Sequence, residues 1–273
     1  MIGLSTYAYF WRMSDRVPAP MSLDDVLRDT AAQGLGLVQI CDHAPLAGYS
    51  DDQLVALRGL ADELGLTIEL GTRGTAPAVL RRYLELAVAL RAPLVRSMWT
   101  AGDDRPDAAE TERRLREVVP EYEAAGVTLA LETYEQVSSA DLVDVVRAVG
   151  SDRLGIVLDP ANTVARLEHP DDVTARCAPY VANWHVKDFA FSRKDGWVGF
   201  ALTSTPLGEG LLDLDGIAAA LVAADNPHVA RDGGVNQVVE HWLPWQDDPA
   251  TTTRLEAAWT TSTIDHLRRK NHD

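Results

Sequence analysis

Long apolar runs are absent from this chain of 273 residues, and cysteine is nearly absent. No stretch approaches the roughly 20 consecutive apolar residues that cross a bilayer, so we expect no membrane segment. Only Cys41 and Cys177 are present, too few for a disulfide framework. The first residues lack the basic start and the small-residue cleavage site of a secretory signal. These absences predict a cytoplasmic protein.

Positive charge is also scarce. Lys and Arg together number 25 against 41 Asp and Glu, which gives a formal net charge of −16. Phosphate backbones attract clustered Lys and Arg and are repelled by an acidic surface, so this balance argues against nucleic acid as a partner. It says little about a small substrate, which responds to the local charge of its pocket. Hydrophobic residues, at 46%, are numerous enough for one large core.

A short aliphatic run, a turn and a longer helical stretch recur along the chain. Signals for helix ends lie between the runs, such as a capping box at Ser22 and the glycines Gly34, Gly65 and Gly126. Strands that alternate with helices pair in parallel through right-handed crossovers. Eight such units predict one α/β domain over residues 1–273, a closed (β/α)₈ TIM barrel. The predicted strands are Ile2–Thr6, Leu37–Cys41, Thr67–Gly71, Leu94–Met98, Thr128–Thr133, Leu154–Asp159, Val181–Val186 and Asn236–His241.

Four consecutive strands carry a metal-binding side chain at or near their C-terminal ends: Glu132, Asp159, His185 and Glu240. Active sites of such barrels lie where the strands end, so we expect these side chains to converge. Three carboxylates repel one another in a low dielectric, and a divalent cation would resolve that conflict. Oxygen-rich ligation with one imidazole suits Mn²⁺ or Mg²⁺, with Co²⁺ or Zn²⁺ as alternatives. For any single residue, pairing with a helix cap or an arginine is an equally good explanation.

These motifs resemble a known family, the xylose isomerase-like barrels, and within it the sugar phosphate isomerases and epimerases, a group that also includes endonuclease IV. The segments that carry the resemblance are Leu129–Glu132, Leu158–Asn162, His185–Asp188, Pro206–Gly210 and Val239–Glu240. The resemblance extends over essentially the whole chain. It implies one divalent ion held by the four side chains, with Glu132 and Glu240 also acting as an acid/base pair. It is also compatible with a homo-oligomer, a dimer or a tetramer.

A site of this kind would act on a small ketose or sugar acid. The ion would bind a carbonyl and a neighbouring hydroxyl, lower the pKa of the adjacent C–H and stabilise an enediolate. One glutamate would remove a proton and the other would return one, which gives epimerisation or isomerisation. The alternative is a metal-dependent lyase, a decarboxylase or dehydratase of a 3-oxo or 2-keto sugar acid. In that case the same electron sink accepts the electrons of a lost carboxylate, or a β-hydroxyl is expelled.

Two positions depart from the ketose 3-epimerase branch of the family. Asn162 stands where that branch has a histidine three residues after the aspartate, and Phe191 stands where it has an arginine six residues after the histidine. Residues Gln39–Asp42 and Thr72–Gly74 show a looser resemblance to the family's 3-oxo-isoapionate decarboxylases. These departures argue against an epimerase of free ketoses.

Several more side chains near strand ends are candidates for substrate binding, namely Lys187, Arg73, Arg96, Asn162 and His43. Three cations at one mouth favour a carboxylate or a phosphate, which arginine binds through two hydrogen bonds. The alternative is that each cation neutralises a nearby acid such as Asp42, Asp159 or Asp188. An apolar wall is a further expectation, built from Tyr7, Tyr9, Phe10, Trp11 and Trp99, with a loop at Gly208–Gly210 closing over the site.

Two other classes of function compete with an enzyme of sugar metabolism. A non-catalytic sugar- or metal-binding barrel would keep pocket aromatics but could lose an acid/base glutamate, and both glutamates are present. A phosphodiesterase like the DNA-repair relatives would need further histidine ligands and a basic groove. The sequence shows neither of these features.

Overall fold

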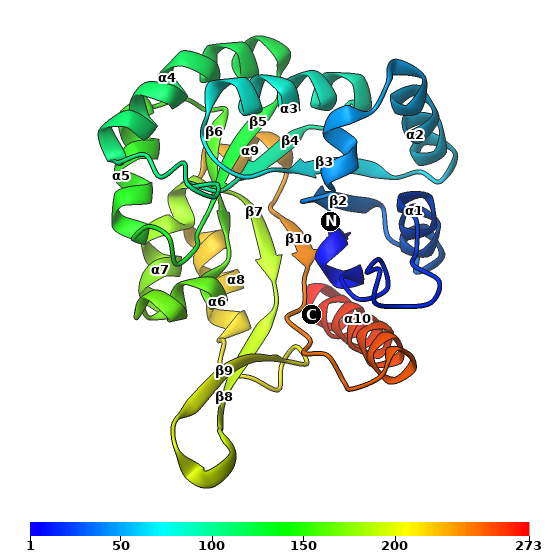
Figure 1. The fold of residues 1–273 in the computed structure, drawn as a ribbon. Coiled ribbons are helices and arrows are strands. Elements are labelled where there is room, and N and C mark those ends of the chain that lie inside the picture. The colour runs from blue at the N-terminus through cyan, green and yellow to red at the C-terminus, as the bar shows by residue number, and fades with distance from the viewer. Residues whose placement is uncertain (273) are drawn as a thin grey trace.

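The computed structural model describes residues 1–272 and confirms the closed parallel barrel (Figure 1). Neighbouring strands follow the order β1-β10-β7-β6-β5-β4-β3-β2, and each pairing is parallel. All eight barrel strands lie where the sequence predicts them, and some end one or two residues earlier than expected. Their bounds are β1 Ile2–Ser5, β2 Leu37–Cys41, β3 Thr67–Gly71, β4 Leu94–Ser97, β5 Thr128–Glu132, β6 Leu154–Leu158, β7 Val181–Val186 and β10 Asn236–Val239.

Helices surround the barrel and begin and end at the predicted signals. Ser22 accepts a hydrogen bond from Asp25 N and donates its own N–H to the Asp25 carboxylate, which is the predicted capping box. Gly34, Gly65 and Gly126 have φ of 71°, 69° and 71°, the left-handed conformation that glycine adopts without strain. The helices are α1 Leu23–Ala32, α2 Asp51–Glu63, α3 Pro77–Leu90, α4 Ala108–Ala125, α5 Ser139–Val149, α6 Pro160–Thr163, α7 Pro170–Cys177, α8 Leu214–Ala223, α9 Pro227–Asp232 and α10 Pro249–His272. None of these described helices is long and apolar enough to cross a membrane.

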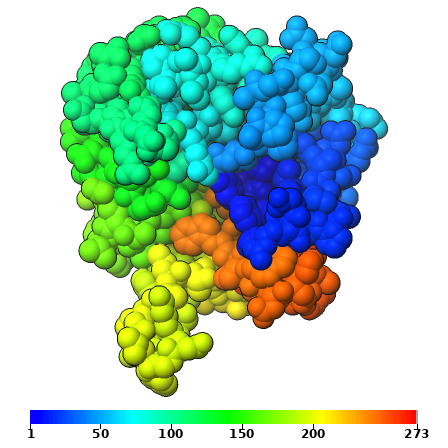
Figure 2. Space-filling model, in the orientation of Figure 1, coloured from blue at the N-terminus to red at the C-terminus, as the bar shows by residue number. Residues whose placement is uncertain are grey.

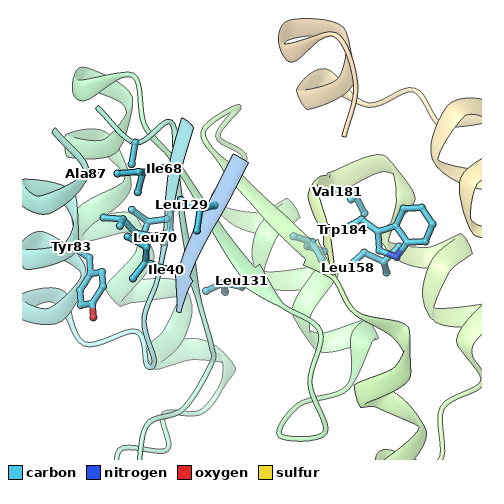
Figure 3. Close-up of a cluster of buried hydrophobic side chains, with 14 of the residues drawn as sticks. Ile40, Ile68, Leu70, Tyr83, Ala87, Leu129, Leu131, Leu158, Val181 and Trp184 are labelled. Carbon is cyan, nitrogen blue, oxygen red and sulfur yellow. The ribbon is translucent and has the colours of Figure 1, made fainter. Parts of the chain in front are cut away.

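The main hydrophobic core lies between the strands and the helices. Leu129, Leu131 and Leu158 belong to it, as the period-two pattern of their strands predicts (Figure 3). Figure 3 also shows Tyr83 and Ala87 of α3 near the strand residues of this core. The opposite faces of the strands form a separate small cluster of Leu94, Ala130 and Val157. These apolar side chains fill part of the barrel interior, and polar groups lie at its C-terminal mouth.

An antiparallel hairpin that the sequence analysis did not predict follows β7. Its strands, β8 Asp188–Arg193 and β9 Phe200–Thr205, extend away from the barrel (Figures 1 and 2). The carboxylate of Asp188, at its base, accepts backbone hydrogen bonds from Gly208, Gly210 and Leu212 at 2.9–3.1 Å. A Cβ on Gly210 would lie only 2.1 Å from Asp188 Oδ1. The predicted loop at Gly208–Gly210 is thus held in place by Asp188, and Gly210 allows that close approach.

Candidate metal centre

The four predicted ligands come together at the mouth of the barrel. Glu132 is the last residue of β5, His185 lies in β7, and Asp159 and Glu240 directly follow β6 and β10. One ligand atom from each residue lies within 4.8 Å of those of the other three, and all four side chains are buried. Parallel strands place their C-terminal ends at one rim of the barrel, which explains why residues far apart in the sequence meet here.

Polar atoms without partners point into the middle of this cluster. His185 Nδ1 lies 3.4 Å from Glu240 Oε1, 3.6 Å from Glu132 Oε1 and 3.7 Å from Asp159 Oδ2. Among the residues that the structure describes, His185 Nδ1 and Glu240 Oε1 have no hydrogen-bond partner. Buried polar atoms normally have partners, and three carboxylate oxygens with one imidazole nitrogen suit a divalent cation. The donor set therefore fits a metal ion.

Two buried cations and one amide surround the carboxylates. Arg96 donates through Nε to Glu132 Oε2, and Asn162 Nδ2 donates to Glu132 Oε1 at 2.7 Å. On the other side of the cluster, Lys187 Nζ lies 2.6 Å from Asp159 Oδ2 and 2.9 Å from Glu240 Oε2. Both oxygens of Glu132 are thus engaged, whereas Glu240 keeps one oxygen free to face the cluster.

These neighbours set the charge state of the cluster when no cation is bound. Burial alone would raise the pKa of Glu132, but Arg96 and then His185 hold that pKa well below its ordinary value. Burial alone would lower the pKa of His185, but Glu240 and Glu132 raise it to about 10. For Lys187, burial is likewise outweighed by Asp159 and Glu240, and its pKa lies above the ordinary value. The imidazole is therefore positively charged at neutral pH.

A second group of residues lies at the rim. The guanidinium of Arg73 binds both oxygens of Asp42 at 3.0 Å and donates to Tyr7 Oη at 2.8 Å. Tyr7 Oη in turn donates to Asp42 Oδ2 at 2.6 Å, and burial together with Asp42 raises the pKa of this phenol. Asp42 has a φ of 52°, an uncommon conformation for a residue with a side chain. Arg73 remains about half exposed, so it faces the solvent at the mouth.

The structure brings some of the predicted substrate residues to the cluster and not others. Arg96, Asn162 and Lys187 contact the carboxylates of the cluster, whereas Arg73 and His43 do not. Each of the three cations is paired with an acid, which was the stated alternative to substrate binding. Arg96 binds Glu132 and also lies 3.8 Å from Asp42. His43 lines a cavity of about 290 Å³ beside Asp42 and the aromatic residues of the β1 loop.

The predicted aromatic wall is only partly correct. Tyr7 and Phe10 stack with ring centroids 6.1 Å apart and line the same cavity as His43. Tyr9 was wrong as a wall residue, because it is fully buried and hydrogen bonds Asp29 and Thr30 on α1. The indoles of Trp11 and Trp99 donate to backbone carbonyls of nearby loops, so they stabilise the mouth loops.

Sequence reasoning missed a polar layer inside the barrel beneath the cluster. It consists of Gln39, Glu69, Asn183 and Asn236, joined by side-chain hydrogen bonds. The alternation of side chains along a strand could have identified two of them, because residues two apart face the same way. Asn183 shares its face with His185, and Gln39 shares its face with Cys41. No signal of this kind identifies Glu69, whose partners lie on other strands.

Comparison with known proteins identifies the family. The model of the xylose isomerase-like TIM barrel family matches residues 27–260. The chain belongs to this family. A relative from Pectobacterium atrosepticum, 3-oxo-isoapionate decarboxylase, is 47% identical over 270 residues, which are 99% of this chain and 96% of that protein.

Two solved structures share the fold at low identity. D-psicose 3-epimerase, solved in the presence of D-fructose, superimposes with a TM-score of 0.70 at 14% identity, covering 99% of this chain and 98% of that one. A xylose isomerase-like TIM barrel protein from Mycobacterium smegmatis, in complex with magnesium, gives a TM-score of 0.69 at 19% identity, covering 96% of both chains. At these identities the likeness establishes the fold alone.

The charge on His185 predicts how metal affinity depends on pH. Because the pKa of the metal-free imidazole is about 10, a cation that binds Nδ1 at pH 7 must displace one proton. We expect calorimetric titration with Mn²⁺ in buffers of different ionisation enthalpy to report about one proton released, and affinity to rise up to about tenfold per pH unit between pH 6 and 9. The exposed His169→Gln variant should release the same number of protons. Binding without proton release would contradict this charge state.

Proposed function

We propose that this protein is a divalent-metal-dependent lyase that decarboxylates a 3-oxo sugar acid. The observation that carries the proposal is the 47% identity with 3-oxo-isoapionate decarboxylase along almost the full length of both chains. The ion would be held by Glu132, Asp159, His185 and Glu240, and Mn²⁺ or Mg²⁺ suits this donor set best.

The charge of the cluster supports an anionic substrate. Three carboxylates face two cations, Arg96 and Lys187, and His185 is neutral once it acts as a ligand. A divalent ion then leaves one net positive charge in a buried site, and a carboxylate on the substrate would balance it. At the rim, Arg73 presents a half-exposed guanidinium, so it is our candidate for the first contact with that carboxylate.

Unequal surroundings of the two glutamates also favour a lyase. Arg96 and Asn162 occupy both oxygens of Glu132 and keep it ionised, which suits a ligand better than a base that exchanges protons. On the other side, Glu240 has a free oxygen and lies against the Lys187 ammonium. An epimerase needs proton transfer on two faces of its substrate, whereas a decarboxylase needs one proton delivered once.

The chemistry can be assigned to this chain's residues as follows. The bond between the carboxylate carbon and C2 breaks, CO₂ leaves, and the electron pair moves toward the C3 ketone oxygen. A divalent cation, when bound, supplies the positive charge that favours electron flow to that oxygen. Lys187 then provides the proton that takes the place of the carboxylate on C2, and Glu240 holds Lys187 in position. Asn162 and Arg96 keep Glu132 fixed throughout, and His43 lines a cavity of about 290 Å³ that would receive part of the substrate.

An isomerase or epimerase of a small ketose is the second candidate. The observation that favours it is that Glu132 and Glu240 both offer an oxygen to the same cluster, as a two-base mechanism requires. Phe191, however, stands where the ketose 3-epimerases have an arginine, and it offers neither a positive charge nor a hydrogen-bond donor. Its side chain is exposed on the hairpin strand β8.

A reaction in D₂O separates these two candidates. The protein, loaded with Mn²⁺ or Mg²⁺, would be mixed with 3-oxo-isoapionate, other 3-oxo and 2-keto sugar acids, and free ketoses, and the products followed by NMR. We expect CO₂ release from a 3-oxo acid, with one deuterium on the carbon that carried the carboxylate. Deuterium entering a ketose without loss of CO₂ would contradict the decarboxylase and support the isomerase.

A substitution at Lys187 tests the source of the proton. We expect Lys187→Met to slow decarboxylation by about 10²–10⁴-fold, the usual contribution of a positioned acid. Its affinity for Mn²⁺ should not weaken, because the substitution removes a positive charge beside the carboxylates. The exposed Lys194→Met on the hairpin serves as the matched control and should keep the parent rate. A Lys187→Met protein with the parent rate would exclude this residue as the proton donor.

A further inference from the structure

A buried carboxylate lies inside the barrel, one layer below the candidate metal centre. Glu69 on β3 is 1% exposed and accepts three side-chain hydrogen bonds from other strands. The donors are Gln39 Nε2 at 3.0 Å, Asn183 Nδ2 at 2.8 Å and Asn236 Nδ2 at 2.7 Å. Gln39 is its direct partner in the register of β2 and β3, whereas Asn183 lies across the barrel on β7. Burying an acid costs free energy, and none of the roles proposed for the catalytic residues explains why Glu69 is buried.

The carboxylate fixes the orientation of the Gln39 amide. Both oxygens of Glu69 accept hydrogen bonds from amide NH₂ groups, and the atom of Gln39 that faces Glu69 is its NH₂ group. The carbonyl oxygen of the amide then points the opposite way. It faces His185 Nε2 at 2.8 Å and also accepts from Cys41 Sγ at 3.2 Å.

That oxygen in turn fixes the imidazole. Because Gln39 Oε1 is an acceptor, the His185 nitrogen beside it must carry a hydrogen. When the ring is neutral, the lone pair is therefore on Nδ1, the atom that faces the oxygens of Glu132, Asp159 and Glu240 at 3.4–3.7 Å. In the other tautomer, the lone pair of Nε2 would face the lone pairs of Gln39 Oε1, which is unfavourable. The hydrogen would then be on Nδ1, where a cation must bind.

We propose that Glu69 is a positioning residue for the metal centre, which acts through the Gln39 amide to hold His185 with its Nδ1 lone pair toward the three carboxylates. The relay runs from β3 through β2 to β7, and its geometry needs all three strands in register. It rests on the metal-binding role of the four side chains and is independent of the reaction that the ion serves.

Glu69 also ties β3 to β7 and β10, so loss of stability alone would not establish a positioning role. The test is a double-variant cycle on metal affinity, with Glu69→Gln, Gln39→Met and the two combined, in protein shown to be folded by circular dichroism. Mn²⁺ alone, titrated by calorimetry, is the probe. Because partners that orient a ligating histidine are typically worth 10–100-fold in affinity, we expect each single variant to bind Mn²⁺ 10–100-fold more weakly. The double variant should bind no more weakly than Gln39→Met, since Glu69 acts through Gln39.

A spectroscopic measurement reports the ring directly. In the Zn²⁺-loaded protein with ¹⁵N-labelled histidine, long-range ¹H–¹⁵N correlation should show the His185 proton on Nε2. Glu69→Gln should lose that single state or exchange its Nε2 proton faster with solvent. If Glu69→Gln does not fold, Glu69→Asp replaces it, because its shorter side chain keeps the charge but withdraws it from Gln39.

Glu256→Gln is the matched control. Glu256 is also 1% exposed, but it accepts hydrogen bonds from the backbone of Trp11 and Arg12 and is not joined to His185. It should change stability and leave Mn²⁺ affinity and the His185 spectrum unchanged. The proposal is overturned if a folded Glu69 variant binds Mn²⁺ as tightly as the parent, or if the losses of the two single variants multiply in the double variant.

Discussion

Three buried carboxylates lie close together at the mouth of this barrel. Their repulsion in a low dielectric is the constraint to which the neighbouring residues respond. Arg96 neutralises Glu132 on one side, Lys187 neutralises Asp159 and Glu240 on the other, and the protonated His185 balances the remaining charge. A divalent cation would replace the proton on His185 and supply positive charge in its place. The site is thus balanced with the proton bound and carries one net positive charge when a divalent cation replaces it.

Buried or partly buried carboxylates also hold the loops that form the mouth. Asp188 fixes the loop through Gly208 and Gly210, Glu256 on α10 fixes the loop after β1, and Glu168 accepts from Ser139 N at the start of α5. Each satisfies backbone N–H groups that would otherwise lack partners. Part of the acidic character of this chain is therefore structural, and it does not by itself indicate what the protein binds.

Much of this architecture follows from the sequence because it depends on local periodicity. Strands that alternate small and large apolar residues, such as Leu129, Ala130 and Leu131, show which face meets the helices, and the last polar residue of each strand then falls at the mouth. Glu132 and Asp159 could be placed in this way without any knowledge of contacts. The helix ends at Ser22 and Gly126 are equally local.

Pairings across the barrel could not be predicted in this way. Arg96 was expected to meet a substrate or an acid such as Asp42. It does lie 3.8 Å from Asp42, but it donates its hydrogen bond to Glu132 on the next strand, which the register of β4 and β5 brings beside it. The sequence shows Glu69 only as an acid within a strand and does not indicate its partners. Closure of the barrel brings Asn183 to it. The sequence analysis did not predict the hairpin after β7, whose two strands pair with each other and not with the barrel strands.

The central claim is that a single cation occupies the space among these four side chains. Anomalous diffraction from crystals grown with Mn²⁺ tests it most directly. We predict one strong manganese peak bonded to an oxygen of each of Glu132, Asp159 and Glu240 and to Nδ1 of His185. Ordered manganese elsewhere with the four side chains still paired to Arg96 and Lys187, or a manganese bonded to Nε2 of His185, would contradict the account.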